Sequence, residues 1–232
     1  VGVPSGVEET LLDMFSFSKP RPVLIAASTL RGEDEPVLRA FCQVQAAVPD
    51  ALLVIAPRHP ERFDESKAYA EQFGYRVHRR SEMPLEESTD MTVILLDTIG
   101  ELRCLFRIAS AVFVGGSLVP AGGHNLLEPA VFGKAVVVGP HMDNFAAVTD
   151  EFLKERAVLQ VQTPAQLTEE LVSLMSDPGR RMRLGSRAAS VVAANRGATQ
   201  RCMSVIARYV STNSITHGRV PSPQGPGEAP LC

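Results

Sequence analysis

Five short runs of Val, Ile and Leu recur along the chain, and each is followed by a segment with helical periodicity. Every run carries apolar residues at both odd and even positions, which indicates burial on both faces. Strands of this kind form a parallel sheet covered by helices and joined by right-handed crossovers. The sequence therefore predicts an α/β fold with a doubly wound parallel sheet. The runs are 22–28, 51–57, 91–97, 111–116 and 134–140, with shorter expected strands at 75–80 and 158–162.

Helical patterns lie between these runs, and three more follow the last of them. After residue 210 the chain is rich in Pro, Gly and Ser, a composition typical of disorder. We therefore expect one Rossmann-like domain over residues 1–210 and a disordered tail over 211–232. The expected helices are 33–48, 61–74, 100–110, 125–133, 144–157, 164–176, 178–195 and 197–210.

The composition excludes several classes of protein. With 45% hydrophobic residues the chain can bury a sizeable core, and its net charge of −3 argues against a general nucleic-acid binder. It has no run of 18 or more apolar residues, so we expect no membrane-spanning helix. The four cysteines show no CxxC spacing, which is typical of a reduced chain rather than a disulfide scaffold or a zinc site.

Polar residues and glycines follow the predicted strands at the points where the strands end. In an open parallel sheet, ligands bind outside the carboxyl ends of the strands, where the strand order reverses. Since all these ends lie at one edge, we expect these residues to form a single site. They are Ser28 and Thr29, then Pro57 and Arg58, then Ile99, Gly100 and Glu101, and finally Gly115, Gly116 and Ser117.

The types of residue at this edge suit a nucleotide. The pair Gly115 and Gly116, which opens the stretch "GGSLVPAGGHNLLEPAVFG", would let backbone N–H groups approach a ligand closely. Asn125 lies at the start of a short predicted helix, a position that favours an anion. Arg58 is a forked donor for phosphate, and Glu128 could accept hydrogen bonds from a ribose. Taken singly, these residues are equally consistent with a turn, an ion pair or helix-end charges.

Other nucleotide and catalytic motifs are absent from the sequence. There is no GxxxxGK[ST] phosphate loop, and no GxGxxG follows the first strand. Ser117 lies in GGSLV rather than GxSxG, which excludes an esterase nucleophile elbow. The histidines lack metal-ligand spacing, so we expect neither a metal nor a cofactor.

Several spaced motifs resemble those of the 3-deoxy-D-manno-octulosonic acid (Kdo) transferases. They are "IAAST" followed by "GE", "APRHPERF", and the long stretch from "LLDTIGELRCLF" to "GPHMDNF", and the resemblance runs over about residues 20–210. It implies a Rossmann-like C-terminal half of a glycosyltransferase B-type fold. It also implies a CMP-Kdo donor, a lipid A precursor as acceptor, and an inverting, metal-independent transfer at the cytoplasmic face of the bacterial inner membrane.

The resemblance also implies which residues bind the donor. Three segments match the CMP-binding segments of the family, and Ser28–Thr29 and Gly115–Ser117 are expected to line the same cleft. The general base, the membrane anchor and most acceptor contacts belong to the N-terminal half of the family, so no catalytic residue is assigned here. We therefore expect this chain to bind the donor without transferring it alone. The matching segments are Pro57 and Arg58, Ile99 to Glu101, and Asn125, Leu126, Leu127 and Glu128.

Two other classes of function remain open on the residues alone. One is a UDP-sugar glycosyltransferase or epimerase domain of the same fold. The other is a non-catalytic scaffold, for which the Pro- and Gly-rich tail would serve as a linker.

Overall fold

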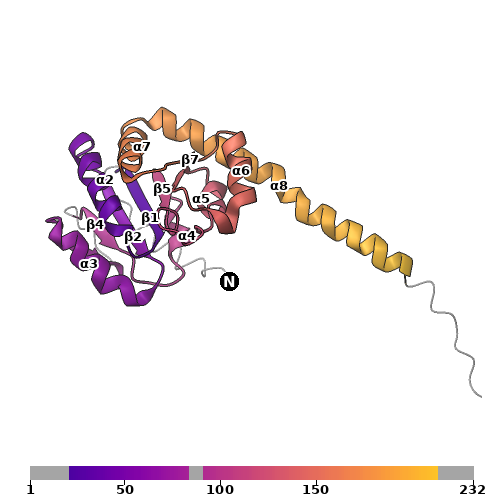
Figure 1. The fold of residues 1–232 in the computed structure, drawn as a ribbon, viewed down its shortest axis with the longest axis horizontal. Helices are drawn as coiled ribbons and strands as arrows, with labels where there is room; N and C mark the ends of the chain where they lie inside the picture. Colours follow the sequence, from indigo (N-terminus) through magenta and orange to yellow (C-terminus); the bar gives the residue numbers. More distant parts are fainter. Residues whose placement is uncertain (1–20, 84–90, 214–232) are drawn as a thin grey trace, which may run out of the picture. The chain divides into compact units, whose positions relative to one another are not determined.

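A single parallel sheet of seven strands forms the centre of the molecule (Figure 1). The computed structural model describes residues 21–83 and 91–213, with side chains described up to residue 195. The strand order is β3-β4-β2-β1-β5-β6-β7, and every pairing is parallel, which confirms the expected fold class. The strands are β1 (Val23–Thr29), β2 (Leu52–Pro57), β3 (Val77–Arg79), β4 (Val93–Leu95), β5 (Ala111–Val114), β6 (Ala135–Val138) and β7 (Leu159–Gln160).

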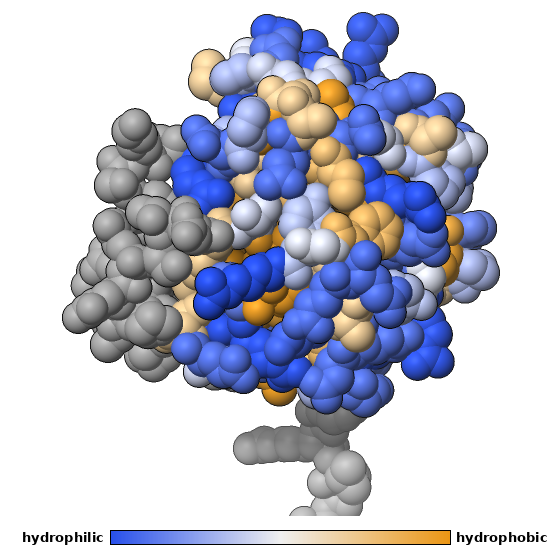
Figure 2. Space-filling view, turned by 90° about the vertical axis from the view of Figure 1, so that its left-hand side faces the viewer, coloured by the Kyte–Doolittle hydropathy of each residue, from blue (hydrophilic) through white to orange (hydrophobic). Residues whose placement is uncertain are grey.

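Helices cover both faces of the sheet. Helices α2 and α7 pack together over one face, and α4, α5, α6 and the first part of α8 contribute to the apolar layer on the other. Figure 2 shows that the side of the molecule carrying α2 and α3 is mainly hydrophilic, with hydrophobic residues in scattered patches. The helices are α2 (Asp34–Ala47), α3 (Phe63–Gln72), α4 (Leu102–Leu105), α5 (Leu127–Val131), α6 (Ala146–Lys154), α7 (Pro164–Ser176) and α8 (Pro178–Asn213).

Both faces of the five strands β1, β2, β4, β5 and β6 are buried, as their composition predicts, whereas the short edge strands β3 and β7 are only partly buried. In β1, Ile25 belongs to the apolar layer on one face and Leu24 to the layer on the other, and neither is accessible to solvent. The same division applies in β5 to Val112 and Phe113. An alternating run of polar and apolar residues would have left one of these faces in water.

The last two expected helices are one continuous helix, α8. The expected break fell at residue 196, beside Gly197, but a glycine inside a helix costs only about 1 kcal/mol and keeps its N–H donor. The neighbouring alanines favour helix, so the helix continues. It also extends three residues past the expected boundary at 210, to Asn213, while the rest of the expected tail, 214–232, lies outside the described residues. Residues up to Ala194 form one compact unit, and a second unit begins at Asn195.

The strand order reverses beside β1. The chain runs from β1 to β2 on one side and returns with β5 on the other. Ala27 pairs with Val114, and Thr29 pairs with Pro57. The carboxyl ends of β2, β1 and β5 are therefore neighbours, and this switch point is where ligands bind in such sheets.

Candidate functional site

The segments that follow the central strands lie side by side, as expected from the sequence. The N–H of Arg58 donates to the carbonyl of Thr29 over 3.0 Å, and the N–H of Gly115 donates to the carbonyl of Ala27 over 2.7 Å. On the far side of β2, the N–H of Leu96 donates to the carbonyl of Ile55 over 2.8 Å. These bonds bring the sequence-predicted site residues after β1, β2, β4 and β5 to a single edge.

The contact between Ser28 and Gly115 requires a glycine. A Cβ added at Gly115 would lie 2.5 Å from the carbonyl oxygen of Ser28, closer than real side chains come. Ser28 itself has a φ of +55°, in the left-handed region that residues other than glycine rarely adopt. Strain of this kind persists where the surrounding structure holds it, often next to a binding site.

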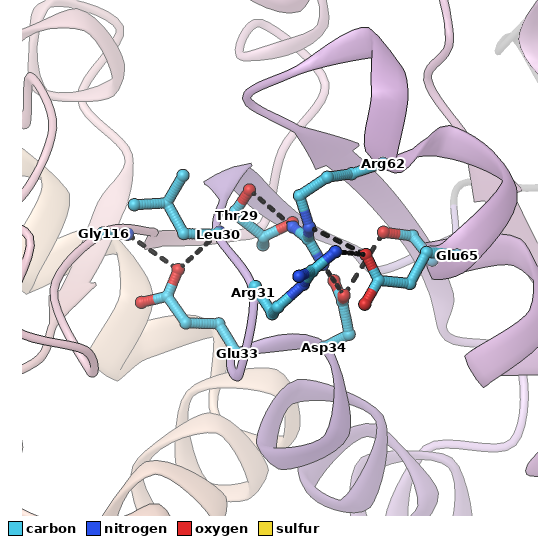
Figure 3. Close-up of polar contacts among 9 residues, drawn as sticks. Thr29, Leu30, Arg31, Glu33, Asp34, Arg62, Glu65 and Gly116 are labelled. Atoms are coloured by element: carbon cyan, nitrogen blue, oxygen red, sulfur yellow. Dashed lines mark hydrogen bonds and ion pairs between the residues drawn. The ribbon is translucent and has the colours of Figure 1, made fainter.

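A buried glutamate organises the glycine loop (Figure 3). The carboxylate of Glu33 accepts hydrogen bonds from the N–H groups of Gly116 (2.7 Å) and Leu30 (2.8 Å), which the figure shows. It also accepts the N–H groups of Ser117 (3.0 Å) and Leu118 (2.9 Å). The expectation that the N–H groups of this loop face a ligand was therefore wrong in detail. They form an anion-binding concavity, but a side chain of the same protein already fills it.

Glu33 belongs to the "GE" motif that contributed to the family resemblance, but it was not expected to be a site residue. Its side chain has 0% solvent exposure. Burial raises the pKa of Glu33, and its four backbone hydrogen bonds oppose that shift. Its bond to the N–H of Leu30 is local, but it is not a capping box, because Glu33 immediately precedes α2 instead of lying at its third residue. The bonds to residues more than 80 positions away have no signal in the local sequence.

A second buried network lies beneath Thr29 (Figure 3). Arg62 forms an ion pair with Asp34 and donates to the carbonyl of Thr29 over 3.0 Å. The hydroxyls of Thr29 and Ser66 both donate to Asp34 over 3.3 Å. Burial raises the pKa of Asp34, whereas the charge of Arg62 lowers it. Thr29 is fully buried, so it supports this edge from below.

Ser117 supports the ligand edge from within the core, as Thr29 does. It is fully buried, its hydroxyl donates to the carbonyl of Val114, and it accepts the N–H of Gly139 over 2.8 Å. These bonds join the ends of β5 and β6. Thr29 and Ser117 were expected to line the cleft. Their hydroxyls are instead buried beneath it, where they form hydrogen bonds within the protein.

Three cationic or basic side chains gather above the glycine loop. Arg58 and His59 are exposed and follow β2, and His124 lies against Gly116, where an added Cβ would come within 3.0 Å of the imidazole ring. Burial lowers the pKa of His124, and the nearby charges of Arg58 and His59 lower it further. The Nε2 atom of His124 is buried without a hydrogen-bond partner among the described residues. From the sequence, His124 was expected to be a structural or loop donor and not an acid–base catalyst, and its place beside Arg58 was not predicted.

The segment from Asn125 to Glu128 forms the start of α5. The N–H of Leu127 donates to Oδ1 of Asn125 over 3.0 Å, and Nδ2 of Asn125 donates to Oε1 of Glu128 over 3.2 Å. Leu126 is fully buried, whereas the side chain of Glu128 is exposed. Leu126 and Leu127 therefore anchor the segment in the core, and Asn125 and Glu128 are its polar groups available to a ligand.

Ile99 is held out into solvent at the end of β4. Its side chain is 88% exposed, and it precedes Gly100, whose φ is +92°. Glu101 fixes this turn: it accepts the hydroxyl of Thr98 over 2.6 Å and forms an ion pair with Arg80 at 3.0 Å. An exposed aliphatic side chain on a fixed turn offers an apolar surface on which a flat ring could rest.

Among the described residues, no three His, Cys, Asp or Glu side chains come together as ligands for a metal ion. None of the described helices combines the length and the apolar character that a membrane-spanning segment needs.

Sequence comparisons place the chain among Kdo transferases. It is 38% identical over 200 residues to the 3-deoxy-D-manno-octulosonic acid transferase of Haemophilus influenzae, which covers 85% of this chain and 46% of that protein. It is 35% identical to the enzyme of the same name from Bordetella pertussis, over 80% of this chain and 44% of that protein. The chain thus spans somewhat less than half the length of these curated relatives. No family model matches it.

Structural comparisons identify the corresponding part of such proteins. The C-terminal CMP-Kdo binding domain of WaaA from Acinetobacter baumannii aligns with a TM-score of 0.73 and 32% identity, over 80% of this chain and 97% of that one. The C-terminal domain of the glycosyltransferase LpcC from Francisella tularensis has a TM-score of 0.56 at 15% identity, a likeness that shows the fold alone. Together they confirm the expected C-terminal half of a glycosyltransferase B-type fold.

Proposed function

Since this chain belongs to the Kdo transferase family and corresponds to its C-terminal part, we propose that it binds the nucleotide-sugar donor CMP-Kdo. The observation that carries the proposal is the 32% identity to a CMP-Kdo binding domain of which the chain covers 97%. The edge built from the ends of β1, β2, β4 and β5 supports the same conclusion, because it is the usual ligand edge of such a sheet.

The side chains at this edge suggest how each part of CMP is held. Arg58 and His124 would bind the phosphate, because a guanidinium and an imidazole that lacks an acceptor are both suited to an anion. Ile99 would support the cytosine ring, and its backbone neighbours Gly100 and Glu101 would lie beside it. Asn125 and Glu128 would hydrogen-bond the ribose hydroxyls. Pro57, Leu126 and Leu127 would fix the backbone that carries these groups.

The transfer itself would need the half of the protein that lies N-terminal to this domain in its relatives. In the proposed inverting reaction, a carboxylate of that half takes the proton of the acceptor hydroxyl, and the oxygen attacks the anomeric carbon of Kdo. The bond from that carbon to the phosphate oxygen breaks, and CMP leaves with its electrons. Arg58 and His124 would stabilise the charge that develops on the phosphate, without a metal. The acceptor would be a lipid A precursor, which would place the complete enzyme at the cytoplasmic face of the bacterial inner membrane.

Calorimetric titration of the 232-residue chain tests the donor assignment directly. We expect CMP to bind with 1:1 stoichiometry and at least 10-fold more tightly than UMP, UDP or NAD, and we expect Arg58→Ala to weaken it. Tight binding of UDP without binding of CMP would instead identify a UDP-sugar domain of the same fold. Absence of binding by any of the four nucleotides would favour a non-catalytic scaffold.

A further inference from the structure

A cavity lined by arginines lies on the β7 edge of the sheet, among residues of α6, β7 and the first turns of α8. Figure 1 labels these three elements. We call it the arginine cavity. Its volume is about 580 Å³, and it shares no residue with the proposed donor site. No Asp or Glu side chain lines it. Its lining residues are Leu153, Val158, Leu159, Gln160 and Leu184 together with Arg156, Arg180, Arg183 and Arg187.

The positive charge of this cavity is only partly neutralised. Arg180 is paired, since it lies 2.6 Å from Glu170. Arg183 comes only within 3.8 Å of Asp177, and both of these side chains are more than half exposed, so water screens the pair. The guanidinium of Arg156 has no polar partner among the described residues. Arg187 donates to the carbonyl of Arg156 over 3.4 Å.

Acidic residues adjoin the cavity on more than one side. Asp143 and Asp150 line a small neighbouring cavity that shares Leu153 and Gln160 with it, but none of the four arginines. Glu151 and Glu155 line a neighbouring cavity together with Arg187, so the charge of Arg187 is shared between the two cavities. Arg156 and Arg183 do not line that neighbour. They are the two cations left for a ligand of the arginine cavity.

The backbone at Arg156 is a second, independent observation. This residue follows the last turn of α6, its φ is +51°, and its N–H donates to the carbonyl of Leu153 over 3.0 Å. Glycine is the usual residue at such a helix end, because it adopts the left-handed conformation without a steric penalty. An arginine in this position is unfavourable for folding, and a strained residue that faces a cavity suggests a role in binding.

We propose that the arginine cavity binds the phosphate groups of an anionic ligand, with Arg156 and Arg183 as the principal donors. Guanidinium groups bind phosphate oxygens through paired, charge-assisted hydrogen bonds. The cavity has room for at least two phosphate groups, and its apolar wall of Leu153, Val158 and Leu184 would accommodate the carbon skeleton that carries them. Such phosphates belong either to a soluble metabolite or to a lipid headgroup.

Titration calorimetry of the 232-residue chain with inorganic pyrophosphate tests the proposal. The donor site is kept saturated with CMP, so that pyrophosphate reports on the arginine cavity alone. We expect saturable 1:1 binding that weakens about 10-fold in Arg156→Gly and in Arg183→Ala, because each removes charged hydrogen bonds. Arg76→Ala, which removes an exposed arginine next to β3, serves as the control and should change the affinity less than twofold.

The variant Arg156→Gly separates binding from folding. Since glycine relieves the left-handed backbone, we expect its melting temperature to stay the same or rise by about 2 °C while pyrophosphate binding is lost. A structural arginine would give the opposite result, a lower melting temperature with unchanged binding.

Co-sedimentation with phosphatidylglycerol vesicles, compared with phosphatidylcholine vesicles, identifies the source of the phosphate. Selective binding to phosphatidylglycerol that Arg156→Gly abolishes would identify a lipid headgroup, and pyrophosphate binding without vesicle binding would identify a soluble ligand. The proposal is overturned if Arg156→Gly weakens neither kind of binding, or if Arg76→Ala weakens them equally.

Discussion

The polar groups buried beneath the ligand edge and those that lie above it differ in how fully other groups of the protein engage them. Below the edge, Glu33, Asp34 and Arg62 are buried, and hydrogen bonds or ion pairs within the protein engage all three. Even Nε of Arg62, which has no hydrogen-bond partner among the described residues, lies 3.5 Å from the carboxylate of Glu65. Above it, Arg58 is exposed and His124 keeps a buried ring nitrogen without a partner. A buried polar group is costly unless it is bonded, so the first set maintains the fold and the second is left for a ligand.

The largest effect is expected below the edge, from Arg62→Met. It leaves the carboxylate of Asp34 buried without its cation, and such losses destabilise proteins by about 3–5 kcal/mol. Urea unfolding followed by circular dichroism measures the change. The double variant Arg62→Met/Asp34→Leu removes both charges and should recover most of the lost stability; no recovery would mean that Arg62 acts through packing rather than through the pair.

The next effect is expected from Glu33→Ala. Three N–H groups of the glycine loop then lose their acceptor, and each buried donor left unsatisfied costs about 1 kcal/mol or more. We expect the free energy of unfolding to fall by about 3 kcal/mol and CMP binding to weaken with it. Glu35→Ala, at an exposed position of the same helix, should stay within about 0.5 kcal/mol. Equal stability of the two variants would contradict the role assigned to Glu33.

Above the edge the expected effects are on binding and not on stability. Arg58→Ala should weaken CMP about 10- to 30-fold, because a charged hydrogen bond to phosphate is lost. Its melting temperature should match that of the unmodified chain, since the side chain of Arg58 is exposed. Titration calorimetry and differential scanning calorimetry give the two values. If Arg58→Ala lost as much stability as Glu33→Ala, Arg58 would also maintain the fold, and the proposed difference between the groups below and above the edge would be wrong.

The smallest effect concerns the proton of His124. Burial and the charges of Arg58 and His59 hold its pKa below the ordinary value of 6.5. In the free protein the neutral form of His124 therefore predominates at that pH. Its contribution to stability is lost as the pH falls from there through the folded-state pKa, because the unfolded chain takes up the proton first. A bound phosphate would raise this pKa, so CMP binding should take up a fraction of a proton near pH 6.

Calorimetry in buffers of different ionisation enthalpy measures that proton uptake. We expect His124→Gln to reduce it and to weaken CMP about threefold at pH 6, whereas His78→Gln, a partly buried histidine of β3, should leave it unchanged. Identical proton uptake in both variants would show that the titrating group is the phosphate of CMP itself.

Much of the fold follows from local sequence patterns. All seven strands were expected. The five apolar runs predicted five of them, because burial on both faces leaves a signal within each run, whereas β3 and β7 are only partly buried and were expected from shorter patterns. The helix ends were less predictable: α4 and α5 are shorter than their patterns, since the expected segments 100–110 and 125–133 form helices only over Leu102–Leu105 and Leu127–Val131. Turns and loops compete with so short a helix, and tertiary packing decides where it stops.

The sequence predicted at which edge of the sheet the site lies, but not the contacts that its individual residues make. The carboxyl ends of parallel strands lie at one edge, so Ser28, Arg58 and Gly115 had to share that edge once the sheet was recognised. That they are immediate neighbours depends on the strand order β2-β1-β5, which only the structure shows. The roles of Thr29 and Ser117 depended on burial, which the sequence does not display. The position of His124 beside Gly116 depended on how the loop between them folds back, a turn closed by the N–H of Gly123 on the carbonyl of Gly116.

The sequence by itself determined the parallel sheet, the edge that carries the site and the membership of the Kdo transferase family, because these rest on periodic composition and on motifs that are contiguous in the chain. Only the tertiary structure decided that Glu33 fills the concavity of the glycine loop, that Asp34 and Arg62 hold the strand ends, and that Arg156 and Arg183 share a cavity. Glu33 reaches N–H groups 83 to 85 residues away. Such contacts form only when the sheet brings distant segments together, and the burial that makes them strong arises at the same moment.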